Sequence, residues 1–179
     1  MWSPSSRRPS LVKGAVAGLV GGVVGTWVKS QAEPVLQDLG ERWFPPTHAE
    51  KERPGADVQG HPDRMPPSKL AQEATDAVGV TLSRDEKLEA QNAIHWGFGA
   101  SAGLAYGVLA EVTEVEAGAG VPAALALFAG THGSTLPAVG LQASPGAMPA
   151  AWWVWELGSH VVYGVAVEVV RRGVRAALR

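Results

Sequence analysis

Four apolar stretches separated by polar segments dominate the hydrophobic and polar pattern of this chain. The stretches cover residues 11–28, 93–112, 120–140 and 151–170, and the charges are concentrated between 29 and 90 and at the two ends. Each stretch is long enough to cross a bilayer as a helix. The pattern therefore predicts an all-α membrane protein that forms one domain of four transmembrane helices.

The polar segment 30–90 is expected to form a long loop outside the membrane. Apolar residues at helical spacing between 35 and 44 predict a short helix along the membrane interface, and a similar pattern predicts another short helix at 68–78. Residues 47–67 are rich in proline, glycine and charge without periodicity, so they are expected to be irregular.

Local signals add detail to this loop. Ser83-Arg-Asp-Glu86 matches a capping box, which predicts the start of a helix that continues into the second span. His48 and His61 lie in the irregular part and are expected to be solvated rather than ligands.

Glycine recurs every four residues in the first two spans. Small residues at this spacing let two helices approach at backbone distance, so we expect packing surfaces inside the chain, with contacts between copies of the chain in a homo-oligomer as the alternative. These glycines are Gly14, Gly18, Gly22, Gly99, Gly103 and Gly107.

Basic and aromatic residues near the span ends predict the orientation in the bilayer. Both ends of the chain carry arginines, whereas the connections after the second and third spans carry no lysine or arginine, so both termini are expected to be cytoplasmic. Trp152, Trp153 and Trp155 fit the membrane interface as anchors. A cleaved signal peptide at the N-terminus is the alternative for the first apolar stretch.

Ionisable residues inside the apolar stretches are the candidate functional groups, because such residues are costly at membrane depth. His95, His132, Glu156 and His160 fall in the outer half of the predicted bundle, and Glu33 could reach the same zone. At the cytoplasmic side, Glu168 has the spacing to pair with Arg171 or Arg172. Glu111 is expected on the same side.

Three interpretations of the outer cluster stay open. Hydrogen bonds between helices would make it purely structural. Imidazoles beside a carboxylate could instead form a pH-sensitive element or part of a proton path. The third interpretation is a metal or haem site, with His95, His132, Glu156 and His160 as ligands for zinc or iron. No tight ligand motif is present, so the absence of a cofactor is the default expectation.

Composition excludes several other classes. The formal net charge of −2 argues against nucleic acid as a partner, and the absence of cysteine removes disulfides and thiolate ligands. The serines lack the context of a catalytic nucleophile, and no glycine loop follows a strand. We therefore expect a non-enzymatic protein whose main partner is the lipid bilayer.

Six segments follow one another in a fixed order along the chain: Val28-Lys29, Ala32-Glu33-Pro34, His95 before Ala110-Glu111-Val112, His132 before Pro137 and Gly140-Leu141, Glu156-x-x-x-His160, and Glu168-Val-Val-Arg171-Arg172. Their order and spacing resemble the YagU family of bacterial inner-membrane proteins. The resemblance implies a multi-span inner-membrane protein associated with acid resistance, and residues 47–67 depart from the family pattern.

Overall fold

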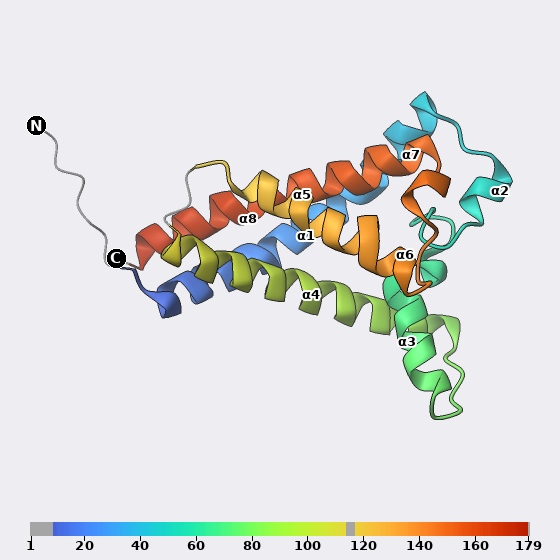
Figure 1. The fold of residues 1–179 in the computed structure, drawn as a ribbon, viewed down its shortest axis with the longest axis horizontal. Coiled ribbons are helices and arrows are strands. Elements are labelled where there is room, and N and C mark those ends of the chain that lie inside the picture. Colours follow the sequence, from blue (N-terminus) through green and yellow to red (C-terminus); the bar gives the residue numbers. More distant parts are fainter. Residues whose placement is uncertain (1–8, 114–116, 179) are drawn as a thin grey trace, which may run out of the picture.

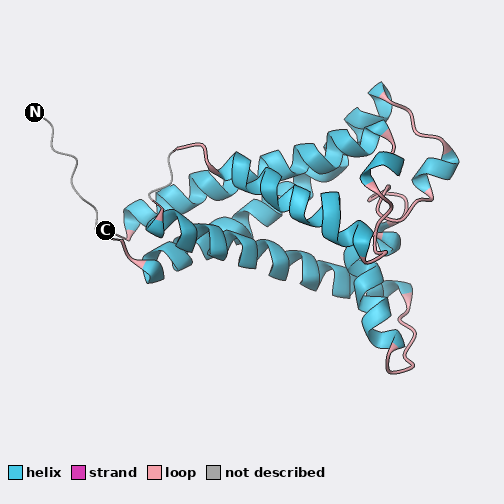
Figure 2. Ribbon diagram, viewed as in Figure 1, coloured by secondary structure: helices cyan, strands magenta, loops and turns pink. Residues whose placement is uncertain are grey.

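The computed structural model describes residues 9–113 and 117–178, which form helices joined by loops (Figures 1 and 2). No strand occurs among these residues, so the predicted all-α class is confirmed for them. The long helices are α1 (Leu11–Trp43), α4 (Arg84–Val112) and α8 (Gly158–Ala177), accompanied by the shorter α5 (Gly120–Gly130).

Shorter elements complete the described chain. They are α2 (His48–Lys51), η1 (Pro62–Arg64), α3 (Pro66–Asp76), η2 (Thr131–Thr135), α6 (Leu136–Ala138), η3 (Pro145–Ala147), α7 (Ala150–Trp152) and η4 (Trp153–Leu157). The predicted capping box is confirmed, because Ser83 and Glu86 bond each other's backbone N–H groups at the start of α4. The second amphipathic helix is also confirmed as α3, which begins at two prolines.

Helix α1 is the centre of the bundle. It packs against α4 on one side and α8 on another, and α8 in turn packs against α5. The beginning of α1 and the end of α8 lie together at one end of the bundle, which we call the termini end; α2, α3 and α7 lie at the other, the loop end (Figure 1).

The two glycine rows face each other across the α1–α4 contact. A Cβ added at Gly22 would lie 2.6 Å from the backbone oxygen of Gly99, and one at Gly18 would lie 2.7 Å from the Cα of Gly107. Side chains at these positions would force the helices apart. The rows are thus packing surfaces inside the chain, as predicted, and an oligomer would have to use other surfaces.

Helix α1 differs from the prediction because it does not end with the first apolar stretch. It begins at the Ser10 cap, continues through Pro34 and ends at Trp43, so the separate interface helix expected at 35–44 is wrong. Gln37 and Gly40 are buried along this continuation, where Gln37 donates to Asp57 and Gly40 packs against Ala151, and these contacts favour one continuous helix over two.

Two turns of the described chain are π-helical, each with one residue more than an α-helical turn. The first, η2, contains His132 and precedes Pro137, which cannot donate a backbone hydrogen bond. The loosening predicted beside His132 is confirmed there. The second, η4, contains Glu156 and has no proline. Nothing in the sequence pattern indicated this second π turn.

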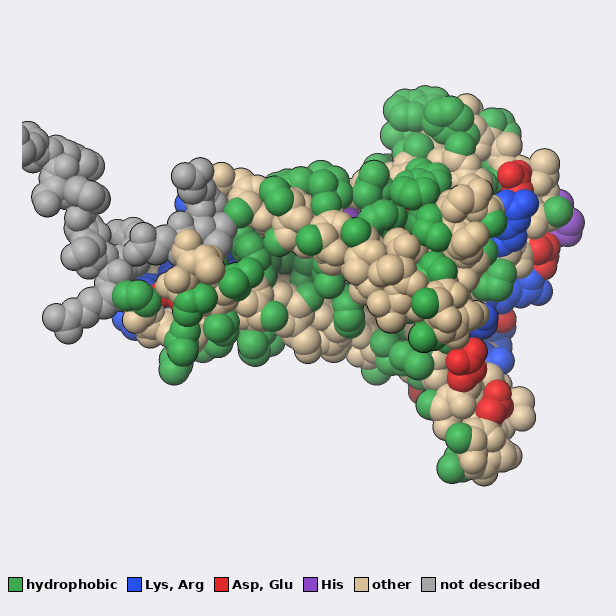
Figure 3. Space-filling model, in the orientation of Figure 1, with side chains coloured by type: hydrophobic (Ala, Val, Ile, Leu, Met, Phe, Trp, Pro, Cys, Tyr) green, Lys and Arg blue, Asp and Glu red, His purple; other side chains and the backbone are tan. Residues whose placement is uncertain are grey.

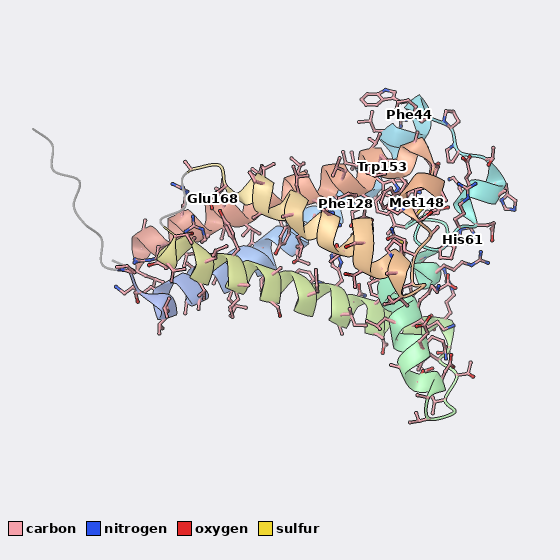
Figure 4. The ribbon with its side chains drawn as sticks, viewed as in Figure 1. Phe44, His61, Phe128, Met148, Trp153 and Glu168 are labelled. Atoms are coloured by element: carbon pink, nitrogen blue, oxygen red, sulfur yellow. The ribbon has the colours of Figure 1, made fainter. Side chains whose placement is uncertain are left out.

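The loop end is more ordered and more buried than predicted. Residues 47–67 contain α2 and η1, and Ala56 and Asp57 are buried, so the expectation of an irregular segment is wrong in part. The tryptophan prediction is also wrong for Trp152 and Trp155, which are 0% and 1% exposed. Both pack with Phe128 and Met148 in a core beneath the loops (Figure 4).

Among the residues that the structure describes, one helix, α1, is long and apolar enough to cross a membrane, with a mean hydropathy of 1.6 in its most apolar window. The four predicted spans are therefore not established by length and composition. The face shown in Figure 3 is mainly hydrophobic along the bundle, and charged side chains gather over the loop end. Arg7, Arg8 and Arg179, used to predict orientation, lie outside the described residues.

Candidate functional site

Glu156 is the centre of a buried polar cluster inside the bundle. Its side chain is almost fully buried, and its Oε1 atom lies 3.5 Å from Lys29 Nζ, 3.5 Å from His132 Nε2 and 3.3 Å from His160 Nδ1. Lys29 also forms an ion pair with Glu33, four residues later on α1. We call this set the loop-end cluster: Lys29, Glu33, His132, Glu156 and His160.

Four elements bring the cluster together. Lys29 and Glu33 project from one face of α1, as residues four apart do. Glu156 lies in the π turn η4, and His160 follows it on α8. His132 lies in the other π turn, η2, and stacks on Phe128 with ring centroids 5.8 Å apart. Because π turns shift the angular position of side chains, both turns help to aim these groups at one point.

Hydrogen bonds show which ring nitrogen of each histidine carries a hydrogen. His160 Nδ1 lies 2.8 Å from the backbone oxygen of Glu156, which can only accept, so Nδ1 donates. His132 Nδ1 lies 2.6 Å from Gln142 Oε1. The Gln142 amide nitrogen donates to the backbone oxygen of His132 at 3.2 Å, which defines the amide orientation. In both neutral rings, Nε2 is therefore the nitrogen with the lone pair.

This assignment makes the contact between His132 and Glu156 unusual. When His132 is neutral, the lone pair of its Nε2 faces a carboxylate oxygen 3.5 Å away, and two acceptors cannot bond each other. A proton or a cation between them would convert the contact into an attractive one. The same conclusion follows from charge, because the cluster holds two carboxylates and one ammonium group.

His95 lies beside the cluster and not in it. Its Nε2 is 3.3 Å from the hydroxyl oxygen of Ser30, and that hydroxyl donates to the backbone oxygen of Thr26 at 2.9 Å. The imidazole therefore donates through Nε2 to Ser30. Glu33 is connected to Glu156 through Lys29, which forms an ion pair with each of them. Of the predicted set, His132, Glu156 and His160 converge directly, with ligand atoms within 4.8 Å of one another.

A cavity of about 290 Å³ lies next to the cluster, lined by residues of α1, α3, α4, η2 and α8 and by one residue each of α5 and α6. Its apolar walls include Phe98 of α4, Leu127 of α5 and Leu70 of α3. Lys29, His95, His132 and His160 also line it, so the cluster is open to this space on one side.

A second polar group, mostly buried, lies toward the termini end, which we call the termini-end cluster: Glu111, Glu168, Arg171, Arg172 and Arg175. Glu168 accepts from Tyr106 at 2.8 Å and from Arg171 at 2.8 Å, and it also pairs with Arg172. The predicted pairing of Glu168 with these arginines is thus confirmed. Glu111 accepts from Arg175 at 2.5 Å and from the backbone of Ser10 at 2.9 Å. Figure 4 labels Glu168 in this part of the bundle.

The sequence analysis does not identify Lys29 and Gln142 as site residues, and it does not predict the ion-pair contact of His61. The i, i+4 spacing of Lys29 and Glu33 is a usable signal for an ion pair, but the pattern groups Lys29 with the charges of the loop. Gln142 gave no signal, because its role depends on the fold. His48 is exposed as predicted, whereas His61 is only partly exposed and lies 3.0 Å from Glu52 Oε1, so the expectation of a solvated His61 is wrong in part.

Comparison with known proteins places the chain in one family. The comparison with curated proteins finds no match, and neither does the comparison with solved structures. A model of a family described as a protein of unknown function, DUF1440, matches residues 23–169, which include every residue of the loop-end cluster. Because this match covers most of its length, the chain belongs to the DUF1440 family of proteins of unknown function.

Proposed function

We propose that this chain is a membrane protein whose loop-end cluster takes up and releases a proton, with His132 and Glu156 as the pair that holds it. The observation that carries the proposal is the placement of an acceptor at each nitrogen of the His132 ring: Gln142 Oε1 at 2.6 Å and Glu156 Oε1 at 3.5 Å. A doubly protonated ring would satisfy both acceptors. It would also balance the charges of Glu33 and Glu156 against Lys29.

Four transmembrane helices form part of the proposal. Large apolar side chains are exposed on the bundle helices, for example Val16 on α1, Leu109 on α4, Leu125 on α5 and Val169 on α8. Such residues are suited to lipid contact. The start of α1 and the end of α8 at one end of the bundle fit an even number of crossings, with both ends of the chain cytoplasmic (Figure 1).

Membership of the DUF1440 family is consistent with the resemblance to the YagU family of bacterial inner-membrane proteins. That resemblance supports a location in the bacterial inner membrane and a role in acid resistance. A group that binds a proton inside the bilayer gives acid resistance a physical basis, because its charge would respond directly to external pH.

Proton flux into liposomes tests the conducting form of the proposal. Wild-type protein should carry flux between pH 7 and pH 5, and Glu156→Gln should reduce it at least tenfold, because the amide cannot stabilise a protonated His132. Glu89→Gln is the matched control, since Glu89 is exposed on α4 and should leave flux unchanged.

Tryptophan fluorescence tests the sensing form. The ring centroids of His132 and Trp152 lie 6.3 Å apart, so proton uptake by the loop-end cluster should change the emission of the wild-type protein as the pH is lowered from 7 to 5. His132→Asn should remove the change and leave the protein folded. The proton proposal is wrong if the wild type shows neither flux nor a change in emission.

A transition-metal site is the second candidate. Imidazoles that bind metals usually donate their other N–H to a carbonyl or carboxylate oxygen, as His132 and His160 both do. Ligand atoms of His132, Glu156 and His160 lie within 4.8 Å of one another, and these residue types are suited to zinc or iron. Lys29 disfavours this reading, because its ammonium group approaches the same Glu156 oxygen atom. Stoichiometric metal in protein purified without chelator, and its loss in Glu156→Gln, would favour this candidate over the first.

A further inference from the structure

The hydroxyl and imidazole groups that line the cavity already donate their hydrogens to other groups of the protein. Each of the cavity's four hydroxyls donates its hydrogen to a backbone oxygen. The pairs are Thr26 with Gly22 at 2.7 Å, Thr131 with Leu127 at 2.8 Å, Thr135 with Gly130 at 2.7 Å, and Tyr163 with Gly99 at 2.6 Å. These hydroxyls can offer a ligand only their oxygen lone pairs.

The histidines that line the cavity follow the same rule. His95 donates to Ser30, His132 donates to Gln142, and His160 donates to the backbone of Glu156. In the neutral rings the remaining nitrogen is an acceptor. Lys29 is the exception, because an ammonium group has three hydrogens and Lys29 donates to the two carboxylates Glu33 and Glu156. One N–H of Lys29 is therefore left for another acceptor.

We propose that this cavity binds a small apolar molecule that carries a neutral hydroxyl or phenol group. The O–H of such a ligand would donate to the acceptors that the lining hydroxyls and imidazoles present, and its oxygen could accept from Lys29. A carboxylate ligand would bring more acceptors next to Glu33 and Glu156, and a cationic ligand would approach the Lys29 ammonium group. Both charged classes are therefore disfavoured.

The walls and position of the cavity define the rest of the ligand. Leu70, Ile94, Phe98, Leu127 and Leu136 provide an apolar lining for a ring or a short alkyl chain. Two of the lining residues, Leu70 of α3 and Phe98 of α4, are also exposed apolar side chains, which suits entry of an apolar molecule from the bilayer. A volume of about 290 Å³ fits a small molecule and not a helix of a partner. This inference does not depend on proton uptake by His132.

Calorimetry with the full chain in lipid nanodiscs tests the proposal, with empty nanodiscs subtracted. The probe is 4-hexylphenol at pH 7.5, compared with 4-hexylanisole, which lacks the O–H donor, and with 4-hexylbenzoate and 4-hexylbenzylammonium. The phenol should bind about tenfold more tightly than the anisole, because one donor meets an otherwise unpaired acceptor. Equal affinities for phenol and anisole, or tighter binding of either charged probe, would overturn the proposal.

Two variants link binding to this cavity. Thr131→Val and Thr135→Val together remove two acceptors at nearly constant shape, and should weaken phenol binding about fivefold or more while leaving anisole binding unchanged. Thr113→Val is the matched control, because the Thr113 hydroxyl also donates to a backbone oxygen, that of Leu109 at 2.8 Å, and Thr113 is not among the lining residues. Loss of phenol affinity in the control to the same extent would contradict the assignment.

Leu70→Trp should obstruct the α3 wall and weaken every probe that binds, whereas Val78→Trp, on an exposed residue outside the lining, should have no effect. These two variants leave every residue of the loop-end cluster unchanged, so they test the cavity separately from the proton proposal. Unchanged phenol binding by Leu70→Trp would place the ligand elsewhere and overturn the proposal.

Discussion

The loop-end and termini-end clusters both bury two carboxylates, but they neutralise them in different ways. Three arginines accompany Glu111 and Glu168, and arginine keeps its charge at all accessible pH values. One lysine accompanies Glu33 and Glu156, and the other neighbours are histidines. The charge of the termini-end cluster is therefore fixed, whereas the charge of the loop-end cluster depends on bound protons. This difference separates a structural ion-pair group from a candidate functional one.

The largest effect is expected at the termini end. Glu168→Gln leaves Arg171, Arg172 and the hydroxyl of Tyr106 without their common carboxylate. Removing one partner of a buried ion pair typically costs about 3–5 kcal/mol, so unfolding should become easier by that amount. Denaturation in detergent at pH 8 and pH 5 measures the loss. The two values should agree, because no histidine takes part in this cluster.

A smaller and pH-dependent loss is expected when Lys29 is replaced. Lys29→Met removes the ammonium group between Glu33 and Glu156, which should destabilise the fold by about 3 kcal/mol at pH 8. The loss should be smaller at pH 5, where a proton bound in the cluster can replace the missing charge. Adding Glu156→Gln should restore part of the stability. Equal losses at both pH values would remove the distinction between the clusters.

The α1–α4 contact lies between the two clusters, and its glycines allow a further test. Gly22→Ala places a Cβ 2.6 Å from the Gly99 oxygen, and such overpacking typically costs about 1–3 kcal/mol. Gly97→Ala is the control, since a Cβ there meets nothing within 4 Å and alanine favours the helix. Thermal unfolding of both variants should show a loss for the first only. A similar loss for both would argue against close packing of α1 on α4.

Asp57 provides a third kind of buried carboxylate, held mainly by neutral donors in the loop. Burial raises its pKa, but hydrogen bonds from Gly60 and Gln37 and the charge of Lys51 outweigh burial and leave the pKa below its ordinary value. The ionised form therefore stabilises the fold at neutral pH, and this contribution is lost as the pH falls below about 4, toward the lowered pKa.

Asp57→Asn tests this expectation. The variant should be about 1–2 kcal/mol less stable than wild type at pH 7, because charged acceptors make stronger hydrogen bonds, and the difference should shrink as the pH falls below 4. Chemical denaturation at pH 7, 5 and 3.5 measures both effects. If the stability difference between wild type and variant grows on acidification, the pKa of Asp57 is raised in the folded protein and the expectation is wrong.

Much of the fold could be predicted because it depends on local pattern. The capping box at Ser83 and the effect of Pro137 on the helix beside His132 follow from hydrogen bonds within a few residues. The two glycine rows were predicted as packing surfaces, since spacing alone places them on one helix face. Trp152 and Trp155 were wrongly placed at the interface, because composition cannot distinguish a tryptophan that faces lipid from one that faces a core.

The sequence by itself determined which ionisable groups lie inside apolar helices, and it gave the i, i+4 relation of Glu156 to His160 and of Glu168 to Arg172. Only the tertiary structure decided which groups meet. In the fold, Lys29 contacts Glu156, and Gln142 accepts from His132. His95 bonds Ser30 and lies outside the cluster, and Glu156 lies in a π turn with its side chain buried. The reason is physical: spacing along a helix defines relative direction, whereas the rotation of one helix against another depends on packing between distant parts of the chain.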